Sequence, residues 1–441
     1  MAMRRRLLII LAALFVLALV AAGSLFYLVR TDEVWESRAT AAPLLVRGYL
    51  RRLRPELAMP TPPPASLAER QRLLAAIATL APTAAPPVIS TPPSTTTPPP
   101  TSVLPSATPP ATATPTITPT PSPTPFPLTP VAQAINLEGV QHAAQMWNNC
   151  GPTTIVMDLS YFGLNQHQRE SAAVLKPNPD DKNVSPEQLA AYAESQGLSA
   201  IIRVGGTLEL LQELVSNGFP VIVEDWILPE DNGGMGHYRL ITGYDTAGGY
   251  FIAQDSYFGP DKHLPFDELH RSWHVFNRKF IVVYEAQREE ALRAVLGPLA
   301  DDETMLASTL GDAQAEVQAN PADALAWFSL GAAFTYRGEM QDAAAAFDEA
   351  RRIGLPLRAL WYQFELFEAY LAVGRSQEVI DLGYATSYTA GGHEEAYYYQ
   401  GLGYAQKGEP EQAAAYYRRA LEYNRNFEPA EKALAELEGA L

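Results

Sequence analysis

The stretch QMWNNCGPTT, residues 145–154, contains the only cysteine of this 441-residue chain, Cys150. Gly151 and Pro152 follow it directly, and proline is favoured in the first turn of a helix, so we expect a helix over residues 150–161. A thiol at a helix N-terminus lies at the positive end of the helix dipole, which favours its ionised form. A lone cysteine is more often a small buried apolar residue, but the neighbours here are polar. The stretch therefore indicates a reactive thiol.

A thiolate nucleophile needs a base, and His237 is the best candidate among the seven histidines. It follows a glycine-rich segment, residues 233–236, and begins an apolar strand that we predict over residues 237–244. The other histidines, His393 among them, are predicted to lie in loops or on solvated polar faces.

The base in turn needs a group that orients it, and a predicted hairpin supplies one. A second strand is expected over residues 250–255, and the glycine pair between the two strands indicates a tight turn. With the turn centred near residues 246–247, Asp255 lies opposite His237, where side chains are about 4.5–5.5 Å apart at Cβ. We therefore expect Asp255 to accept a hydrogen bond from the imidazole. Taken alone, Asp255 would be interpreted as a residue of the turn that ends the strand.

Four further residues near the predicted nucleophile and base are candidates for the site. Gln145 lies five residues before Cys150, where its side-chain amide and the backbone N–H of Cys150 could hold a developing oxyanion. Trp147, Asn149 and Tyr238 are candidates for substrate binding, although Trp147 could equally be a core residue.

The order of these residues resembles that of the papain-fold cysteine peptidases typified by bacteriocin-leader-processing peptidases, cysteine peptidase family thirty-nine. The resemblance covers roughly residues 135–290. It implies Cys150 as nucleophile, His237 as base, Asp255 as its orienting group and Gln145 as oxyanion donor, in peptide-bond hydrolysis through a thioester. The bacteriocin-processing members are fused to a transporter and cut after a Gly-Gly leader. Because no transporter accompanies the domain here, we do not expect that specificity.

Residues 133–288 are predicted to form an α+β domain of papain-like type. Helices come first, with one starting at Pro186 behind the N-cap residue Ser185, and antiparallel strands follow. The expected end of this domain is a strand over residues 280–285.

Residues 289–441 are expected to be all-helical and repetitive. Trp327, Trp361 and Tyr397 are 34 and 36 residues apart, and a glycine follows each at a similar distance. The pattern resembles the tetratricopeptide repeat, with Glu365 replacing the usual glycine in the middle unit. Such arrays more often present a groove to a protein than act as plain spacers, so we predict a protein partner at the groove.

The N-terminus is predicted to be a membrane anchor, residues 1–30. Three arginines precede an apolar run, residues 7–29, which as a helix would be about 34 Å long, enough to cross the hydrocarbon core. The basic cluster keeps the N-terminus cytoplasmic and places the rest outside the membrane. The alternative is a signal peptide cleaved near residues 18–22, and both interpretations export the chain.

Two segments separate this anchor from the α+β domain. Residues 31–80 are expected to form a juxtamembrane stalk. Residues 81–132 are rich in Pro, Thr and Ser and are expected to be a disordered, extended linker, because proline lacks a backbone donor and fixes φ.

Composition excludes several classes of function. Residues 131–441 carry 21 Lys and Arg against 44 Asp and Glu, which disfavours nucleic-acid binding. One cysteine allows neither an internal disulfide nor a zinc site built on paired cysteines. The chain has neither a glycine-rich phosphate loop nor a His-Glu-x-x-His motif, so no cofactor and no metal are predicted.

The sequence leaves three functions open. The first is a membrane-tethered, extracytoplasmic cysteine peptidase whose repeats recruit a peptide or protein. The second is a catalytically inactive papain-like scaffold in which the repeats bind a partner. The third is amidase or acyl-transfer chemistry on the same residues, since the acyl acceptor is not specified by the triad.

Overall fold

The computed structural model describes residues 59–63, 72–73, 127–227 and 234–440. The predicted anchor, residues 1–30, lies outside these ranges, as do most of the predicted stalk and linker. No helix within the described ranges is both long enough and apolar enough to span a bilayer.

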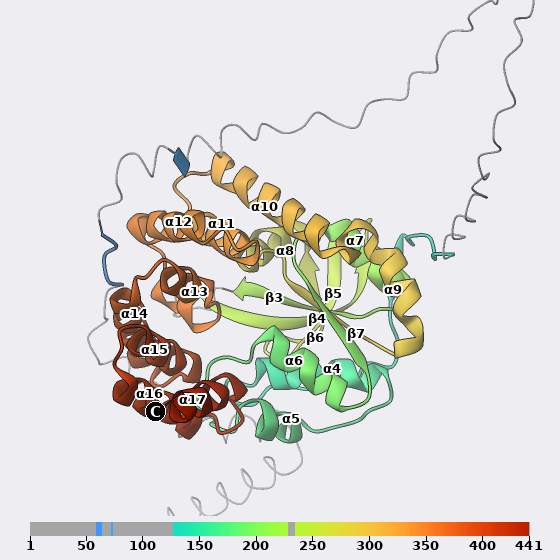
Figure 1. Ribbon diagram of the computed structural model, residues 1–441. Coiled ribbons are helices and arrows are strands. Elements are labelled where there is room, and N and C mark those ends of the chain that lie inside the picture. The colour runs from blue at the N-terminus through green and yellow to red at the C-terminus, as the bar shows by residue number, and fades with distance from the viewer. Residues whose placement is uncertain (1–58, 64–71, 74–126, 228–233, 441) are drawn as a thin grey trace, which may run out of the picture.

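A seven-stranded antiparallel sheet forms the centre of the first domain (Figure 1). Its strands run in the order β2-β7-β3-β4-β5-β6, and β1 pairs with β4. The strands are β1 (Ala134–Asn136), β2 (Ser199–Arg203), β3 (Val221–Ile227), β4 (Met235–Asp245), β5 (Tyr250–Asp255), β6 (Gly259–Pro265) and β7 (Phe280–Tyr284). The central strands β3, β4 and β7 are buried along most of their length.

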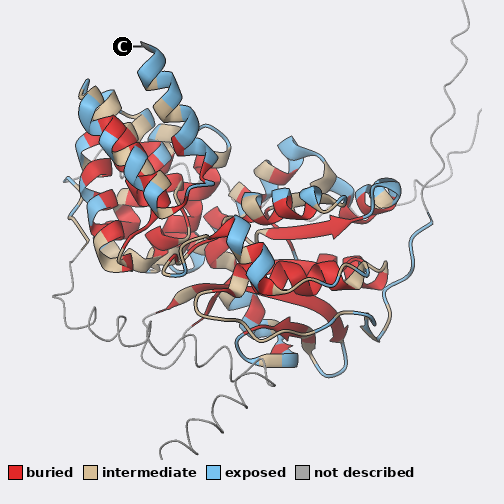
Figure 2. Ribbon diagram, turned by 90° about the horizontal axis from the view of Figure 1, so that it is seen from below, coloured by how far each residue is buried: buried red, intermediate tan, exposed pale blue. Residues whose placement is uncertain are grey.

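Helices cover both faces of this sheet. One face packs against α4 (Cys150–Tyr161), α5 (Gln168–Leu175) and α6 (Pro186–Ser195), and the other against α7 (Leu208–Ser216), α8 (Phe266–Trp273) and α9 (Glu289–Leu296). Successive strand residues alternate between the two cores: Val221 and Val223 join the α7–α9 side, and Ile222 joins the α4–α6 side. Figure 2 shows the resulting buried layer.

The α+β fold class is confirmed, and several elements agree closely with their predictions. The helices at Cys150 and Pro186 begin where expected, the latter with a capping box between Ser185 and Gln188. Four elements of this domain were not predicted: β1 has three residues, α5 and α8 have eight each, and β6 has the polar sequence GPDKHLP. Each is too short or too polar to give a clear hydrophobic period.

The C-terminal region is all-helical, as predicted. It contains α10 (Asp302–Ala319), α11 (Ala324–Tyr336), α12 (Met340–Ile353), α13 (Glu365–Ala372), α14 (Ser376–Ala390), α15 (Glu394–Gln406), α16 (Pro410–Tyr423) and α17 (Glu428–Ala440). Small residues let paired helices approach: a Cβ on Gly331 would lie 2.5 Å from the Phe347 ring, and one on Gly401 would lie 2.4 Å from the Tyr417 ring.

The middle repeat differs from its neighbours in structure at the position where its sequence departs from the repeat pattern. Glu365, at the glycine position, is the first residue of the short helix α13, and Trp361 lies in the preceding 3-10 helix η4 (Leu357–Trp361). The Glu365 carboxylate accepts a hydrogen bond from Tyr336 (2.7 Å) and lies 3.7 Å from the Lys279 ammonium of the α+β domain. Glu365, which is larger than the usual glycine, thus takes part in a contact between the two domains.

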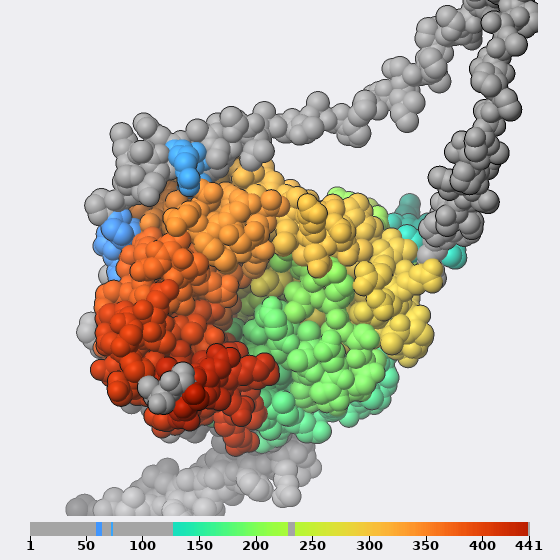
Figure 3. Space-filling model, viewed as in Figure 1, coloured from blue at the N-terminus to red at the C-terminus, as the bar shows by residue number. Residues whose placement is uncertain are grey.

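The helical region packs directly against the α+β domain (Figures 1 and 3). In α11, Ser329 donates to the carbonyl of His274 (3.0 Å) and accepts, through its own carbonyl, from Asn277 (3.0 Å). Before α13, Gln363 donates to the carbonyl of Val275 (3.1 Å). The first helices of successive repeats therefore face the chain's own domain.

Parts of the predicted stalk and linker also contact the folded body. Leu73 is 3% exposed in the core of the repeats, and the carbonyl of Pro60 accepts from Arg351 (2.6 Å). At the other end of the proline-rich stretch, the backbone N–H of Thr129 donates to the side chain of Asn217 (2.8 Å). Described residues on either side of 74–126 thus contact the same body.

Candidate active site

Cys150 is the first residue of α4 and is only partly buried. The preceding turn is fixed in shape, because Asn148 has a left-handed backbone (φ 53°) and its carbonyl accepts from the buried Lys176 ammonium (3.0 Å). The turn presents the thiol at the N-terminus of the helix, as the Cys-Gly-Pro pattern predicts.

His237 and Asp255 are brought together on neighbouring strands. His237 Nε2 lies 2.9 Å from Asp255 Oδ1, and both side chains are fully buried. Asp255 Oδ1 also accepts from the backbone N–H groups of Tyr257 (2.8 Å) and Phe258 (2.9 Å). These bonds fix the carboxylate, and the carboxylate fixes the plane of the imidazole.

The pairing of the strands differs from the predicted register. Leu240 pairs with Gln254, so continuing the ladder places Arg239, not His237, opposite Asp255. The turn accounts for the difference, because Asp245 pairs with Tyr250 and the turn is therefore centred between residues 247 and 248, later than predicted. The register shift between Ile241 and Gly243 then moves the pairing of Asp255 one residue back toward His237. His237 and Asp255 still meet, as diagonal neighbours on one face of the sheet.

The Cys150 thiol and the His237 imidazole shift each other's pKa. Burial opposes ionisation of Cys150, but the hydrogen bond and charge of His237 outweigh it and lower the thiol pKa. Burial likewise opposes protonation of His237, whereas the charge and hydrogen bond of Asp255, with Cys150, raise its pKa to about 9. The arrangement favours a thiolate beside an imidazolium.

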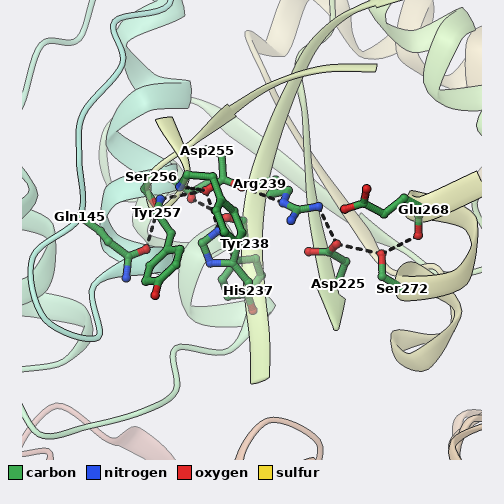
Figure 4. Close-up of polar contacts among 12 residues, drawn as sticks. Gln145, Asp225, His237, Tyr238, Arg239, Asp255, Ser256, Tyr257, Glu268 and Ser272 are labelled. Atoms are coloured by element: carbon green, nitrogen blue, oxygen red, sulfur yellow. Dashed lines mark hydrogen bonds and ion pairs between the residues drawn. The ribbon is translucent and has the colours of Figure 1, made fainter. Parts of the chain in front are cut away.

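Arg239 joins this pair to a second buried aspartate (Figure 4). Its Nε donates to Asp255 Oδ2 (2.8 Å), and its Nη1 donates to Asp225 Oδ2 (2.8 Å), which also accepts from Ser272 (2.9 Å). Despite the cost of burial, the charge of His237, with that of Arg239, lowers the pKa of Asp255. These charges therefore favour the ionised form of Asp255.

Sequence reasoning missed Arg239 and Asp225. The signal was available, because Arg239 is a charged residue two positions after His237 in an otherwise apolar strand, and therefore on the same face. A buried arginine of this kind requires carboxylate partners.

Gln145 is held beside the same loop. Its side-chain oxygen accepts from the Ser256 hydroxyl (2.9 Å), and its backbone N–H donates to the carbonyl of Ser256 (2.8 Å). Ser256 follows Asp255 directly, so Gln145 is tied to the residues that orient His237 (Figure 4). With the amide oxygen engaged, the amide nitrogen is directed away from Ser256.

The three predicted substrate-binding residues occupy different environments. Tyr238 is 3% exposed and donates to the carbonyl of Val184 (2.9 Å), which makes it a core residue on the α4–α6 side. Asn149 is also buried, and its amide donates to Gln168 (3.0 Å). Both side chains are thus committed to structural contacts. Trp147 is half-buried, and its indole N–H has no hydrogen-bond partner among the described residues.

Three aromatic residues near His237 were not singled out from sequence. Tyr257 and Phe258 are about half exposed, at 53% and 47%, with ring centres 6.2 and 6.4 Å from that of His237. From the repeats, the Tyr362 ring packs over Gly236, where a Cβ would approach it to 2.9 Å. Aromatic surface therefore flanks the imidazole from both domains.

We predict that Arg239→Met will lower the free energy of unfolding by about 3–5 kcal/mol, because it leaves Asp225 and Asp255 buried without their cation. Urea denaturation followed by circular dichroism measures the loss. The control, Arg271→Met, removes an exposed arginine that pairs with Asp267 on α8 and should cost less than about 1 kcal/mol. Equal costs for the two variants would show that the buried network is not stabilising.

Comparisons with known proteins find family matches for two segments of the chain. Residues 137–281 match the model of the Peptidase_C39 like family, and residues 394–427 match the tetratricopeptide repeat. No curated protein matches the chain.

Three solved structures are similar to part of the chain. A C39-like peptidase from Bacillus anthracis is 18% identical, with 35% of this chain and 98% of that one covered and a TM-score of 0.30. A double glycine motif protease from an AMS/PCAT transporter, in complex with the leader peptide, is 20% identical (34% and 94% covered, TM-score 0.27). MamA is 18% identical (31% and 80% covered, TM-score 0.28). By the family models alone, the chain combines a segment similar to the Peptidase_C39 like family, residues 137–281, with a tetratricopeptide-repeat match at residues 394–427.

Proposed function

We propose that the chain is a cysteine peptidase in which Cys150 is the nucleophile, His237 the general base and acid, and Asp255 its orienting group. The observation that carries the proposal is the buried imidazole, whose Nε2 is bound to Asp255 at 2.9 Å. Its Nδ1 has no nitrogen or oxygen partner among the described residues, which leaves it to act on the thiol.

The proposed reaction follows from these positions. The Cys150 thiolate attacks the carbonyl carbon of the scissile peptide, and the C–N bond breaks as His237 Nδ1–H protonates the leaving amine. Water then attacks the thioester carbonyl as His237 takes one of its protons, and the C–S bond breaks. The carboxylic acid product leaves, and the Cys150 thiolate and His237 imidazolium are restored. The backbone N–H of Cys150 and the amide of Gln145 would bind the oxyanion in both steps.

We also propose a role for the repeats within the chain itself, in addition to the separate partner that the sequence predicts. Tetratricopeptide repeats bind proteins, and a separate partner stays a prediction. However, the first helices of the repeats already contact the peptidase domain through Ser329, Gln363 and Glu365. We propose that the repeat region acts first in cis, as a support for the peptidase domain.

We predict that His237→Ala will slow alkylation of Cys150 by iodoacetamide about 10-fold or more at pH 7. Without the imidazole the thiol returns to an ordinary pKa near 8.5 or above, so only about 3% is ionised at that pH. Mass spectrometry of the labelled cysteine over time gives the rate.

The matched control is His263→Ala, which removes a histidine stacked on Tyr250 in the same sheet and should leave the alkylation rate unchanged. If His237→Ala labels as fast as the native protein, the thiol is not activated by the imidazole. If the native protein labels rapidly but cleaves no member of a peptide library, the inactive-scaffold function replaces hydrolysis.

We predict that Gln145→Ala will lower kcat for peptide cleavage about 10²–10³-fold, because one oxyanion donor is lost. The rate of alkylation should stay near the native value, since iodoacetamide forms no oxyanion. Gln212→Ala, on α7 across the sheet, serves as the control. An equal loss of alkylation and cleavage would instead indicate that Gln145 acts through the loop that carries Cys150.

We predict a plateau in the pH dependence of kcat/KM that ends near pH 9. Because the pKa of His237 is raised to about 9, the imidazolium loses its proton as the pH rises through that value, and the leaving amine is no longer protonated. On the acid side, the rate falls where the lowered pKa of Cys150 is crossed and the thiolate is protonated. A rate that still rises above pH 9 would contradict the assignment.

A further inference from the structure

A second cluster of titratable side chains is buried where the two domains meet. Asp181 lies in the loop before α6, and His393, Glu394 and Glu395 lie at the start of α15. Three of them are fully buried and Glu395 is 5% exposed. The sequence predicted His393 to lie on a solvated loop, and the structure corrects this: the residue is enclosed by the facing domain. None of the four has a role in the proposed peptidase chemistry.

Each carboxylate of the cluster is held by one of its two oxygens. Asn183 donates its side-chain amide to Glu395 Oε1 (2.9 Å) and its backbone N–H to Asp181 Oδ1 (3.1 Å), and Asn424 donates to Glu394 Oε1 (2.9 Å). The other oxygens, Asp181 Oδ2, Glu394 Oε2 and Glu395 Oε2, are buried and have no hydrogen-bond partner in the described part of the chain. Such orphaned acceptors are costly unless something else binds them.

The histidine is arranged in the same way. His393 Nε2 lies 2.8 Å from the carbonyl of Trp361, which requires a proton on Nε2, so in the neutral ring the lone pair is on Nδ1. Nδ1 is buried and lies 2.9 Å from Glu395 Oε2. Burial opposes protonation of His393, but the charge of Glu395 raises its pKa, so without a metal the two form an ion pair that a bound cation would replace. An imidazole that donates from one nitrogen to a backbone carbonyl and offers the other is typical of a metal ligand.

The side-chain atoms that could bind an ion lie close together. His393, Glu394 and Glu395 each contribute one such atom, and the three atoms lie within 4.8 Å of one another. Adjacent ligands of an octahedral ion with bonds near 2.1 Å are about 3.0 Å apart, close to the 2.9 Å between His393 and Glu395. Asp181 faces the group from the other domain, and its charge acts on Glu394.

We propose that His393, Glu394 and Glu395 bind a divalent cation, and that Asp181, which contacts Glu394 from the other domain, makes this ion a clamp between the repeats and the peptidase domain. One imidazole with two carboxylates suits Zn²⁺ or Mn²⁺ better than Ca²⁺ or Mg²⁺, which take oxygen ligands. The charges also balance: with Asp181 included, the three carboxylates carry −3, the nearby Lys176 carries +1, and the ion supplies +2.

The site also touches the proposed active site through one residue. Lys176, whose charge interacts with Asp181 and Glu394, donates to the carbonyl of Asn148, two residues before Cys150. An ion that fixes Asp181 therefore steadies the loop that presents the thiol. The alternative occupant is a set of shared protons, since burial, with the charge of Asp181, raises the pKa of Glu394 well above its usual range.

The test is metal content and thermal stability of the full-length protein. Purified without chelator, it should contain about one equivalent of Zn²⁺ or Mn²⁺ by mass spectrometry of the elements. After EDTA and its removal, adding either metal at about 100 times its dissociation constant should raise Tm by about 5–10 °C. Co²⁺ added to the stripped native protein should give visible absorption bands that Zn²⁺ abolishes, which tests the site without any mutation.

The variant Glu394→Gln/Glu395→Gln keeps the size of both side chains but removes two charges, and it should lose both the bound metal and the Tm response. Glu365→Gln, which alters a buried carboxylate of the same repeats outside the cluster, should keep them. A native protein with no metal, no Tm response and no Co²⁺ bands would overturn the proposal in favour of shared protons. A metal response that survives in the double variant would overturn it equally, by locating the ion elsewhere.

Discussion

One guanidinium, that of Arg239, lies between two buried aspartates, and the geometry of the candidate active site depends on it. Buried carboxylates without a cation would take up protons, and a protonated Asp255 could not hold an imidazolium. With Arg239 at 2.8 Å from both Asp225 and Asp255, the second aspartate remains an anion. That anion raises the proton affinity of His237, and His237 in turn stabilises the thiolate of Cys150. Ionisation of Cys150 at the helix N-terminus therefore depends on His237, and the charge of His237 depends on Asp255 and Arg239 in the sheet interior.

The sequence predicted the parts of this site that depend on short local motifs. Cys-Gly-Pro at a helix start, a histidine opening an apolar strand and an aspartate closing the next are patterns within a few residues, and each lies in the predicted element. The register between the strands differs by two residues from the prediction, because the turn is centred between residues 247 and 248 and a glycine pair does not specify its centre to the residue. Arg239 could be recognised as a charge on the face of His237, but its partner Asp225 comes from another strand. In the same way Asp181 and the residues around His393 come from different elements, so only the folded chain shows that they meet.

The helical region is bound to the peptidase domain by polar contacts together with a small apolar cluster, in which Leu325 and Tyr362 pack against Trp226, Val275 and Phe276. Ser329, Gln363 and Asn277 exchange hydrogen bonds across the junction, and Asn183 and Asn424 bind the carboxylates at the start of α15. Such contacts are directional, so they fix the orientation of the repeats more strictly than apolar packing would. The same polarity explains why the junction could not be predicted, since hydrophobic periodicity reports cores and not interfaces of this kind.

The attachment of Leu73 and Thr129 to the folded body bears on how far that body could stand from a membrane. Because both residues contact the same body, the number of residues between them does not lengthen a tether that lies N-terminal to Leu73. If residues 7–29 are embedded in a bilayer, as the sequence predicts, residues 30–58 set the largest separation. Fully stretched, 29 residues reach at most about 100 Å. The folded body would then stay within that distance of the lipid surface, and a protein held farther away would be out of its reach.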